Sequence, residues 1–66
     1  MKDKTAKLQR VQRTLEGCKE MAKFNHQKEE EWNNLGSKQQ AFTCRMLAEA
    51  YEFVVRLLEK DLSDEE

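Results

Sequence analysis

The residues Asn33-Asn34-Leu35-Gly36-Ser37-Lys38-Gln39-Gln40 divide the chain into two helical segments, because they interrupt a sequence of helix-forming residues. Asn and Gly tolerate the left-handed backbone conformation that ends helices. Ser37 is a preferred N-cap residue, and Gln40 three positions later completes a capping box for a second helix. We therefore predict helix 1 over about residues 3–33, a turn over 34–37, helix 2 over about 38–62 and an acidic tail at 63–66.

The composition on both sides of this turn favours helices. The 66 residues include no Pro and only two Gly, and they are rich in Ala, Leu, Glu, Lys, Gln, Arg and Met. Three Val, three Thr and no Ile are too few β-branched residues to build strands. Because a short connection makes two long helices antiparallel neighbours, we predict one all-α domain over residues 1–66, a helical hairpin.

Helix 1 carries two apolar stripes. The first has the alternating spacing of three and four residues that is typical of a coiled-coil seam, and it consists of Leu8, Val11, Leu15, Cys18 and Ala22. Polar Asn25 and Glu29 occupy the next seam positions, so we interpret the seam as ending before them. The second stripe lies about 100° around the helix and consists of Met21, Phe24, Trp32 and Leu35, with Lys28 between them.

Helix 2 is apolar over an arc of more than roughly 200°. One stripe consists of Phe42, Met46, Ala50, Phe53 and Leu57, and another of Cys44, Leu47, Tyr51, Val54 and Leu58. A single neighbouring helix cannot cover so wide an arc, and a lone hairpin of this size rarely offsets the entropy lost on folding. We therefore predict a homodimer that forms a four-helix bundle, and the alternative is a hairpin that completes its core with a different protein. The self-association residues are expected to be Leu47, Tyr51, Val54, Val55 and Leu58.

The charges are divided unequally between the two halves of the chain. Residues 1–28 hold eight basic and three acidic side chains, whereas residues 29–66 hold four and ten, for a net charge of −1. The hairpin is expected to bring Lys2, Lys4 and Lys7 close to the acidic tail, which neutralises much of this asymmetry. No apolar run approaches the roughly 20 residues of a membrane span, and no signal-peptide pattern is present. We therefore expect a cytoplasmic protein without membrane contact.

Catalysis and metal binding have little support in the sequence. Cys18 and Cys44 lie on apolar stripes at different predicted levels of the hairpin, so we expect free, buried thiols. His26 lies near Glu29 and Glu30, but CxxC, HExxH and ExxH motifs are absent. Gly-rich phosphate loops and nucleophile elbows are absent as well. We expect a non-enzymatic protein that needs no cofactor and no metal.

Protein binding is the function that the apolar surface favours. The group Met21, Phe24, Lys28, Trp32 and Leu35 combines the aromatic residues and Met that are typical of interface hot spots. The alternative is a local core, because Phe24 is predicted to be level with Met46 and Lys28 with Phe42. We expect a small regulatory or inhibitor protein, of the kind that bacteria and phages encode, which occludes a partner protein or inserts a helix into its groove.

RNA binding is the alternative function. The length, the central turn and the tail Asp61-Leu62-Ser63-Asp64-Glu65-Glu66 resemble the Rop family of small RNA-binding regulators of plasmid copy number. The resemblance is one of architecture, and it implies a four-helix bundle that binds RNA across its paired first helices. Clustered cations are needed to contact backbone phosphates. The candidates are Lys7, Arg10, Arg13 and Lys28. Arg10 and Lys28 share one direction around helix 1 but Arg13 points elsewhere, which makes nucleic acid the less favoured partner.

Overall fold

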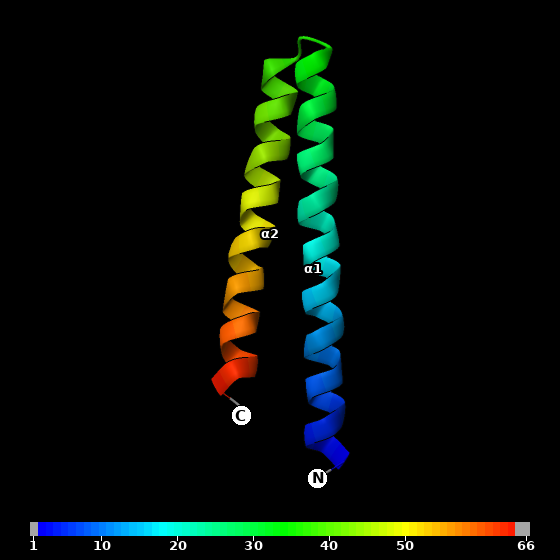
Figure 1. Cartoon of the computed structure of the whole chain (residues 1–66), viewed down its shortest axis with the longest axis vertical. Coiled ribbons are helices and arrows are strands. Elements are labelled where there is room, and N and C mark those ends of the chain that lie inside the picture. Colours follow the sequence, from blue (N-terminus) through cyan, green and yellow to red (C-terminus); the bar gives the residue numbers. More distant parts are fainter. Residues whose placement is uncertain (1, 65–66) are drawn as a thin grey trace.

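The computed structural model is a hairpin of two packed α-helices, which confirms the predicted all-α hairpin (Figure 1). It describes residues 2–64, and the side chains of residues 5–64. Helix α1 comprises Lys2–Asn34 and helix α2 comprises Lys38–Asp64. The hairpin measures 52 × 16 × 12 Å, and the start of α1 and the end of α2 both lie at the end opposite the turn.

The end of α1 is a Schellman motif centred on Gly36. The Gly36 amide donates to the carbonyl of Asn33 at 3.0 Å, and the Ser37 amide donates to the carbonyl of Trp32 at 2.9 Å. These two bonds satisfy carbonyls that the last helical turn leaves without partners. Gly36 has a φ of +80°, a conformation that a residue with a Cβ rarely adopts. The turn is therefore located where the Asn-Asn-Leu-Gly sequence predicts it.

Ser37 begins α2 as its N-cap. Its carbonyl accepts a hydrogen bond from the Ala41 amide at 3.0 Å, the first bond of the new helix. The Ser37 hydroxyl donates to the side-chain oxygen of Gln40. The two residues of the predicted capping box therefore interact through their side chains.

The C-terminal end of α2 extends further than the sequence predicts. Ser63 and Asp64 continue the helix instead of beginning a tail, because the chain after residue 37 contains neither Gly nor Pro and Leu62 is half-buried. Glu65 and Glu66 lie outside the described residues. The predicted proximity of Lys2 and Lys4 to the acidic tail also involves side chains outside that range.

One continuous line of contact, here called the inner seam, joins the two helices. Its positions alternate in steps of three and four residues on both helices. All of its members are buried or half-buried: Leu8, Val11, Leu15, Cys18, Ala22, Asn25, Glu29 and Trp32 on α1, and Ala41, Cys44, Ala48, Tyr51, Val55, Leu58 and Leu62 on α2. The prediction that the α1 seam ends before Asn25 is therefore wrong.

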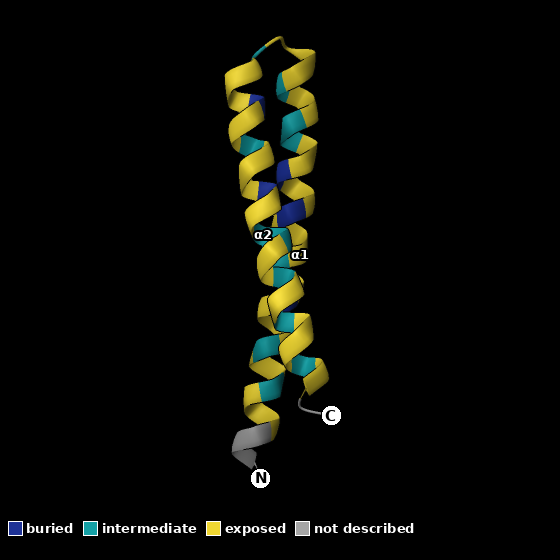
Figure 2. Ribbon diagram, turned by 90° about the vertical axis from the view of Figure 1, so that its left-hand side faces the viewer, coloured by how far each residue is buried: buried dark blue, intermediate teal, exposed yellow. Residues whose placement is uncertain are grey.

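Small side chains form the centre of the inner seam. Apart from Leu15, the buried apolar residues of the described chain are Ala22, Ala41 and Ala48, and most of them lie in the half of the hairpin nearer the turn (Figure 2). Among the described residues no large side chain is fully buried. The hairpin therefore brings its helices together through alanines and leaves most of its bulky apolar groups on the outside.

Candidate protein-binding surface

Nine large apolar side chains of the described chain are exposed. Two belong to α1, one lies in the turn and six belong to α2: Met21, Phe24, Leu35, Phe42, Met46, Leu47, Phe53, Val54 and Leu57. None of these residues is a member of the inner seam. Exposed apolar side chains that gather into a contiguous patch mark sites of interaction in proteins.

The exposed residues Met21 and Phe24 of α1, with Lys28 and the turn residue Leu35, are here called the α1 patch. Met21, Phe24 and Leu35 are 40%, 48% and 75% exposed. The Lys28 ammonium lies 5.5 Å from the centroid of the Phe24 ring, a cation–π contact, and 3.5 Å from a carboxylate oxygen of Glu31. The α1 patch thus combines apolar side chains with one cation at its centre.

Trp32 is separated from the α1 patch although the sequence groups it there. It is half-buried at the inner seam, three positions after Glu29 and seven after Asn25. The alternative prediction, that this group packs against α2 as a local core, does not describe its other members. Phe24 is exposed, and so are Met46 and Phe42, the α2 residues predicted to lie level with Phe24 and Lys28.

The residues predicted to mediate self-association are divided between two surfaces. Tyr51, Val55 and Leu58 are half-buried in the inner seam, because their spacing places them on the side of α2 that faces α1. Leu47 and Val54 remain exposed at 46% and 37%. Within one hairpin, only these two members of the predicted set offer much surface to a second molecule.

A second stripe with coiled-coil spacing runs along the outside of α2 and is here called the outer seam. Its members Thr43, Met46, Ala50, Phe53 and Leu57 follow one another in steps of three and four residues, and all are exposed. At about 100° per residue they lie on the side of α2 opposite the inner seam. The outer seam shares four members with the predicted stripe, and exposed Phe42, Leu47 and Val54 flank it.

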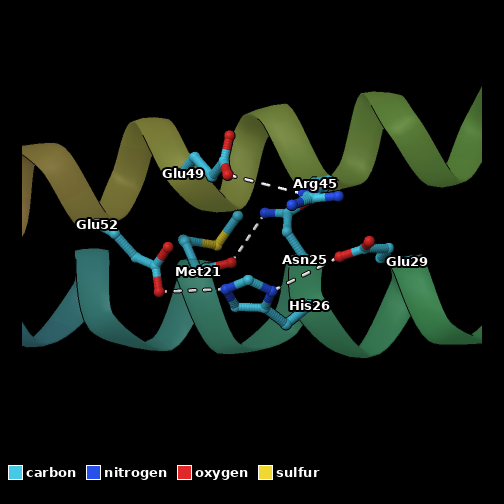
Figure 3. A network of polar contacts seen from close by, with 7 residues as sticks. All are labelled: Met21, Asn25, His26, Glu29, Arg45, Glu49 and Glu52. Atoms are coloured by element: carbon cyan, nitrogen blue, oxygen red, sulfur yellow. Dashed lines mark hydrogen bonds and ion pairs between the residues drawn. The ribbon is translucent and has the colours of Figure 1, made fainter.

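Polar side chains of both helices line one edge of the hairpin, where they interact with one another. Lys19 lies 3.3 Å from Glu59, and His26 Nε2 lies 3.2 Å from a carboxylate oxygen of Glu52 on the opposite helix. His26 Nδ1 lies 3.7 Å from Glu29, as Figure 3 shows. Exposed pairs of this kind contribute only about 0–1 kcal/mol each. This edge aligns the helices but offers no strong anchor for a ligand.

A shallow groove of about 640 Å³ runs along the same edge. Its charged and polar lining is mixed in sign and includes Lys19, Lys23, His26, Glu30, Glu52 and Arg56. In the described part of the chain, no group of three or more His, Cys, Asp or Glu side chains is placed to hold a metal ion. Cys18 and Cys44 are free thiols, half-buried rather than buried.

The four cations considered for RNA binding do not form one cluster. Lys7 and Arg10 line a groove of about 450 Å³ near the open end of the hairpin, together with Val11, Thr14 and Leu58. Lys28 lies eighteen residues beyond Arg10, or about 27 Å along the helix axis. Arg13 is exposed. The structure therefore brings two of the four candidates together.

Comparison with known proteins finds no matching protein-family model, curated protein or solved structure. Neither helix, within its described residues, is long and apolar enough to cross a membrane. Function is therefore inferred from the surfaces of the hairpin themselves.

Proposed function

We propose that this protein is a small, non-enzymatic regulator or inhibitor that binds a partner protein through the α1 patch. The exposure of Met21, Phe24 and Leu35 outside the inner seam is the observation that carries the proposal. Aromatic and Met side chains are the residues on which binding energy concentrates at interfaces. A partner that covers them would remove apolar surface from water.

The spacing of the α1 patch suits a helix-in-groove contact. Phe24 and Lys28 follow Met21 at three and seven positions, so these three lie along one side of α1, and Leu35 directly follows the last residue of that helix. Such anchors dock a rigid helix into an apolar groove or against an amphipathic helix of the partner. The proposed mechanism is occlusion of a surface that the partner needs for its own activity.

We further propose that two hairpins associate through α2 into a four-helix bundle. Six of the nine exposed large apolar residues belong to α2. The inner seam, built around Ala22, Ala41 and Ala48, leaves them uncovered. Fully burying a large apolar side chain contributes about 1.5–3 kcal/mol, so association through α2 would supply stability that one hairpin lacks.

Site-specific photocrosslinking tests the partner surface. A benzophenone side chain introduced at Phe24 should form covalent adducts with a host protein, whereas the same probe at exposed Glu30 should not. Glu30 lies on the same helix, roughly 120° around the axis from Phe24. Met21→Ser should reduce the Phe24 adduct while the helical content stays unchanged. Equal adducts at both positions, or none at Phe24, would contradict the proposal.

RNA binding is the second candidate, supported by the common groove of Lys7 and Arg10. Salt separates the two functions. Contacts to backbone phosphates release counterions, so affinity for RNA should fall steeply between about 50 and 200 mM salt, whereas apolar docking should change little. Lys28 already contacts Glu31, which weakens the RNA candidate. Absence of binding to structured RNA at low salt would eliminate it.

A further inference from the structure

We infer that the outer seam of α2 packs antiparallel against the outer seam of a second copy of this chain, with Ala50 of each copy against Phe53 of the other. The inference rests on the self-association proposed above, and it is independent of the partner that binds the α1 patch. It specifies the surface, the direction and the register of the contact.

The spacing of the outer seam supports a helical occupant. Steps of three and four residues keep side chains on a line that follows a neighbouring helix. On α2 this spacing occurs twice, and the inner seam already uses one of the two lines to contact α1. The outer seam has the same repeat and no neighbour within the hairpin, and its members Thr43, Met46, Ala50, Phe53 and Leu57 carry no charge.

The small side chains of the inner seam indicate that the occupant is a second copy. Among the described residues no bulky side chain is fully buried, so a single hairpin lacks the apolar burial that a domain of this size needs. The surface that completes its core must be covered whenever the chain is folded. Only another copy of the chain is present under every such condition, and a two-fold dimer uses one surface twice.

The order of small and large side chains along the outer seam favours one register of the contact between the two copies. When antiparallel outer seams place Ala50 opposite Phe53 of the second copy, Met46 falls opposite Leu57 of that copy, and the two-fold axis repeats both pairs. A small residue then faces a large one at the centre of the contact, and two flexible or branched side chains face each other at its ends. Alternation of large and small groups is how well-packed helix interfaces fill space.

The observed hairpin shows which side chains meet at the edge of such a contact. His26 and Glu52, which interact at 3.2 Å, each follow an inner-seam residue by one position. Val54 follows the outer-seam residue Phe53 in the same way. If the two copies pack in the proposed register with the antiparallel geometry of the hairpin, their Val54 side chains meet close to the two-fold axis. Leu47 of one copy lies beside Asp61 of the second copy. Position 61 is fourteen residues, or about 21 Å along the helix, from the second copy's own Leu47, so the two Leu47 side chains do not meet.

On the other edge, Glu49 of one copy would lie near Glu49 of the other. Arg45, 3.7 Å from Glu49 on the same helix, supplies a counter-charge there. The proposed register therefore contains one repulsive contact, and replacing Glu49 by Gln should strengthen the dimer. A register in which Glu49 lies at the rim would show no such gain.

Disulfide trapping tests the register directly. In a Cys18→Ala, Cys44→Ala background, Val54→Cys should oxidise rapidly to a covalent dimer, because its two copies meet at the axis. Leu47→Cys is the matched control and should stay monomeric under the same oxidant, because its copies are too far apart for a disulfide. A mixture of Leu47→Cys and Asp61→Cys proteins should form a heterodimer.

Each pattern of trapping has a distinct meaning. Rapid bridging at both Val54→Cys and Leu47→Cys would show a parallel pair, and bridging between Leu47→Cys and Val54→Cys proteins would show a different antiparallel register. Either result would overturn the inference while leaving the proposed self-association intact. A monomeric mass of the unmodified chain at all concentrations would overturn both.

A charge substitution tests the surface without relying on oxidation. Ala50→Glu places a carboxylate in the outer seam on a side of α2 that does not contact α1. We expect sedimentation to show a dimer dissociation constant raised about a hundredfold or more, because two unpaired carboxylates would be buried at the contact. Gln27→Glu adds the same charge to an exposed position of α1 and should leave the dissociation constant unchanged. Equal effects of the two variants would contradict the inference.

Discussion

At the residue scale, Asn25 explains why the inner seam is longer than the sequence suggests. The residue is only 5% exposed, and its side-chain amide nitrogen donates to the Met21 carbonyl at 2.8 Å (Figure 3). A buried polar group is tolerated when it is hydrogen-bonded, and here the acceptor belongs to the same helix. Asn25 therefore stays in the contact with α2 instead of ending it.

Gly36 and Gly17 should respond to alanine in opposite directions. An added Cβ would touch nothing within 4 Å at either position, so both effects come from the backbone alone. Gly36→Ala forces a side chain into a φ of +80° and should lower the free energy of unfolding by about 1–2 kcal/mol. Gly17→Ala lies within α1 and should raise it by about 0.5–1 kcal/mol.

Urea unfolding followed by far-ultraviolet circular dichroism measures both glycine variants. Gly17→Ala is the control for the general effect of adding a methyl group to an exposed site. A stabilising Gly36→Ala would mean that the turn does not hold the left-handed conformation described here.

At the scale of the elements, α1 and α2 divide their apolar residues differently. Helix α1 has a narrow inner seam and a separate patch, whereas α2 has apolar side chains around most of its circumference. Their polar sides meet along one edge, where Lys19 and Glu59 form an ion pair. The opposite sides of the helices are consequently left with the exposed large apolar groups.

Trp32 and Phe24 test this division of α1. Trp32→Ala removes a half-buried side chain from the inner seam and should lower the free energy of unfolding by about 2–3 kcal/mol, less than the loss for a fully buried aromatic. Phe24→Ala removes an exposed side chain and should change it by less than about 0.5 kcal/mol.

Thermal and urea unfolding of the two aromatic variants provides the comparison. This expectation reverses the sequence-based grouping, in which Trp32 belongs with Phe24. Equal loss of stability in both variants would return Phe24 to a core, and no loss in either would remove Trp32 from the inner seam.

At the scale of the whole molecule, a hairpin 52 Å long and 16 Å wide has a large surface for its volume. Its described core lacks a fully buried large side chain. Association is therefore expected to provide a considerable part of its stability.

The melting temperature of the protein should consequently rise with protein concentration. Folding that is coupled to dimer formation is favoured by mass action, whereas the unfolding of a monomer does not depend on concentration. Circular dichroism melts over a hundredfold range of concentration, with sedimentation to establish the mass, measure this directly. A constant melting temperature with a monomeric mass would show that one hairpin folds alone.

Local chemistry made the hairpin predictable from the sequence. The residues Asn33 to Gln40 contain both a helix stop and a helix start, and both operate through backbone hydrogen bonds a few residues long. The seam positions up to Ala22 were predictable for the same reason, since their apolar spacing is visible along the chain. The α1 patch was only partly predictable, because Trp32 lies between Lys28 and Leu35 in the sequence but belongs to the inner seam in space.

Two helices, their turn and an excess of apolar surface on α2 were predictable along the chain, because they follow from propensity, capping and periodicity. Which apolar stripe of each helix faces the other is a property of the folded hairpin. That choice depends on how closely two backbones approach: alanines at positions 22, 41 and 48 permit close contact, and the amide of Asn25 finds an acceptor in its own helix. Met21, Phe24 and the outer seam are exposed as a consequence of that packing.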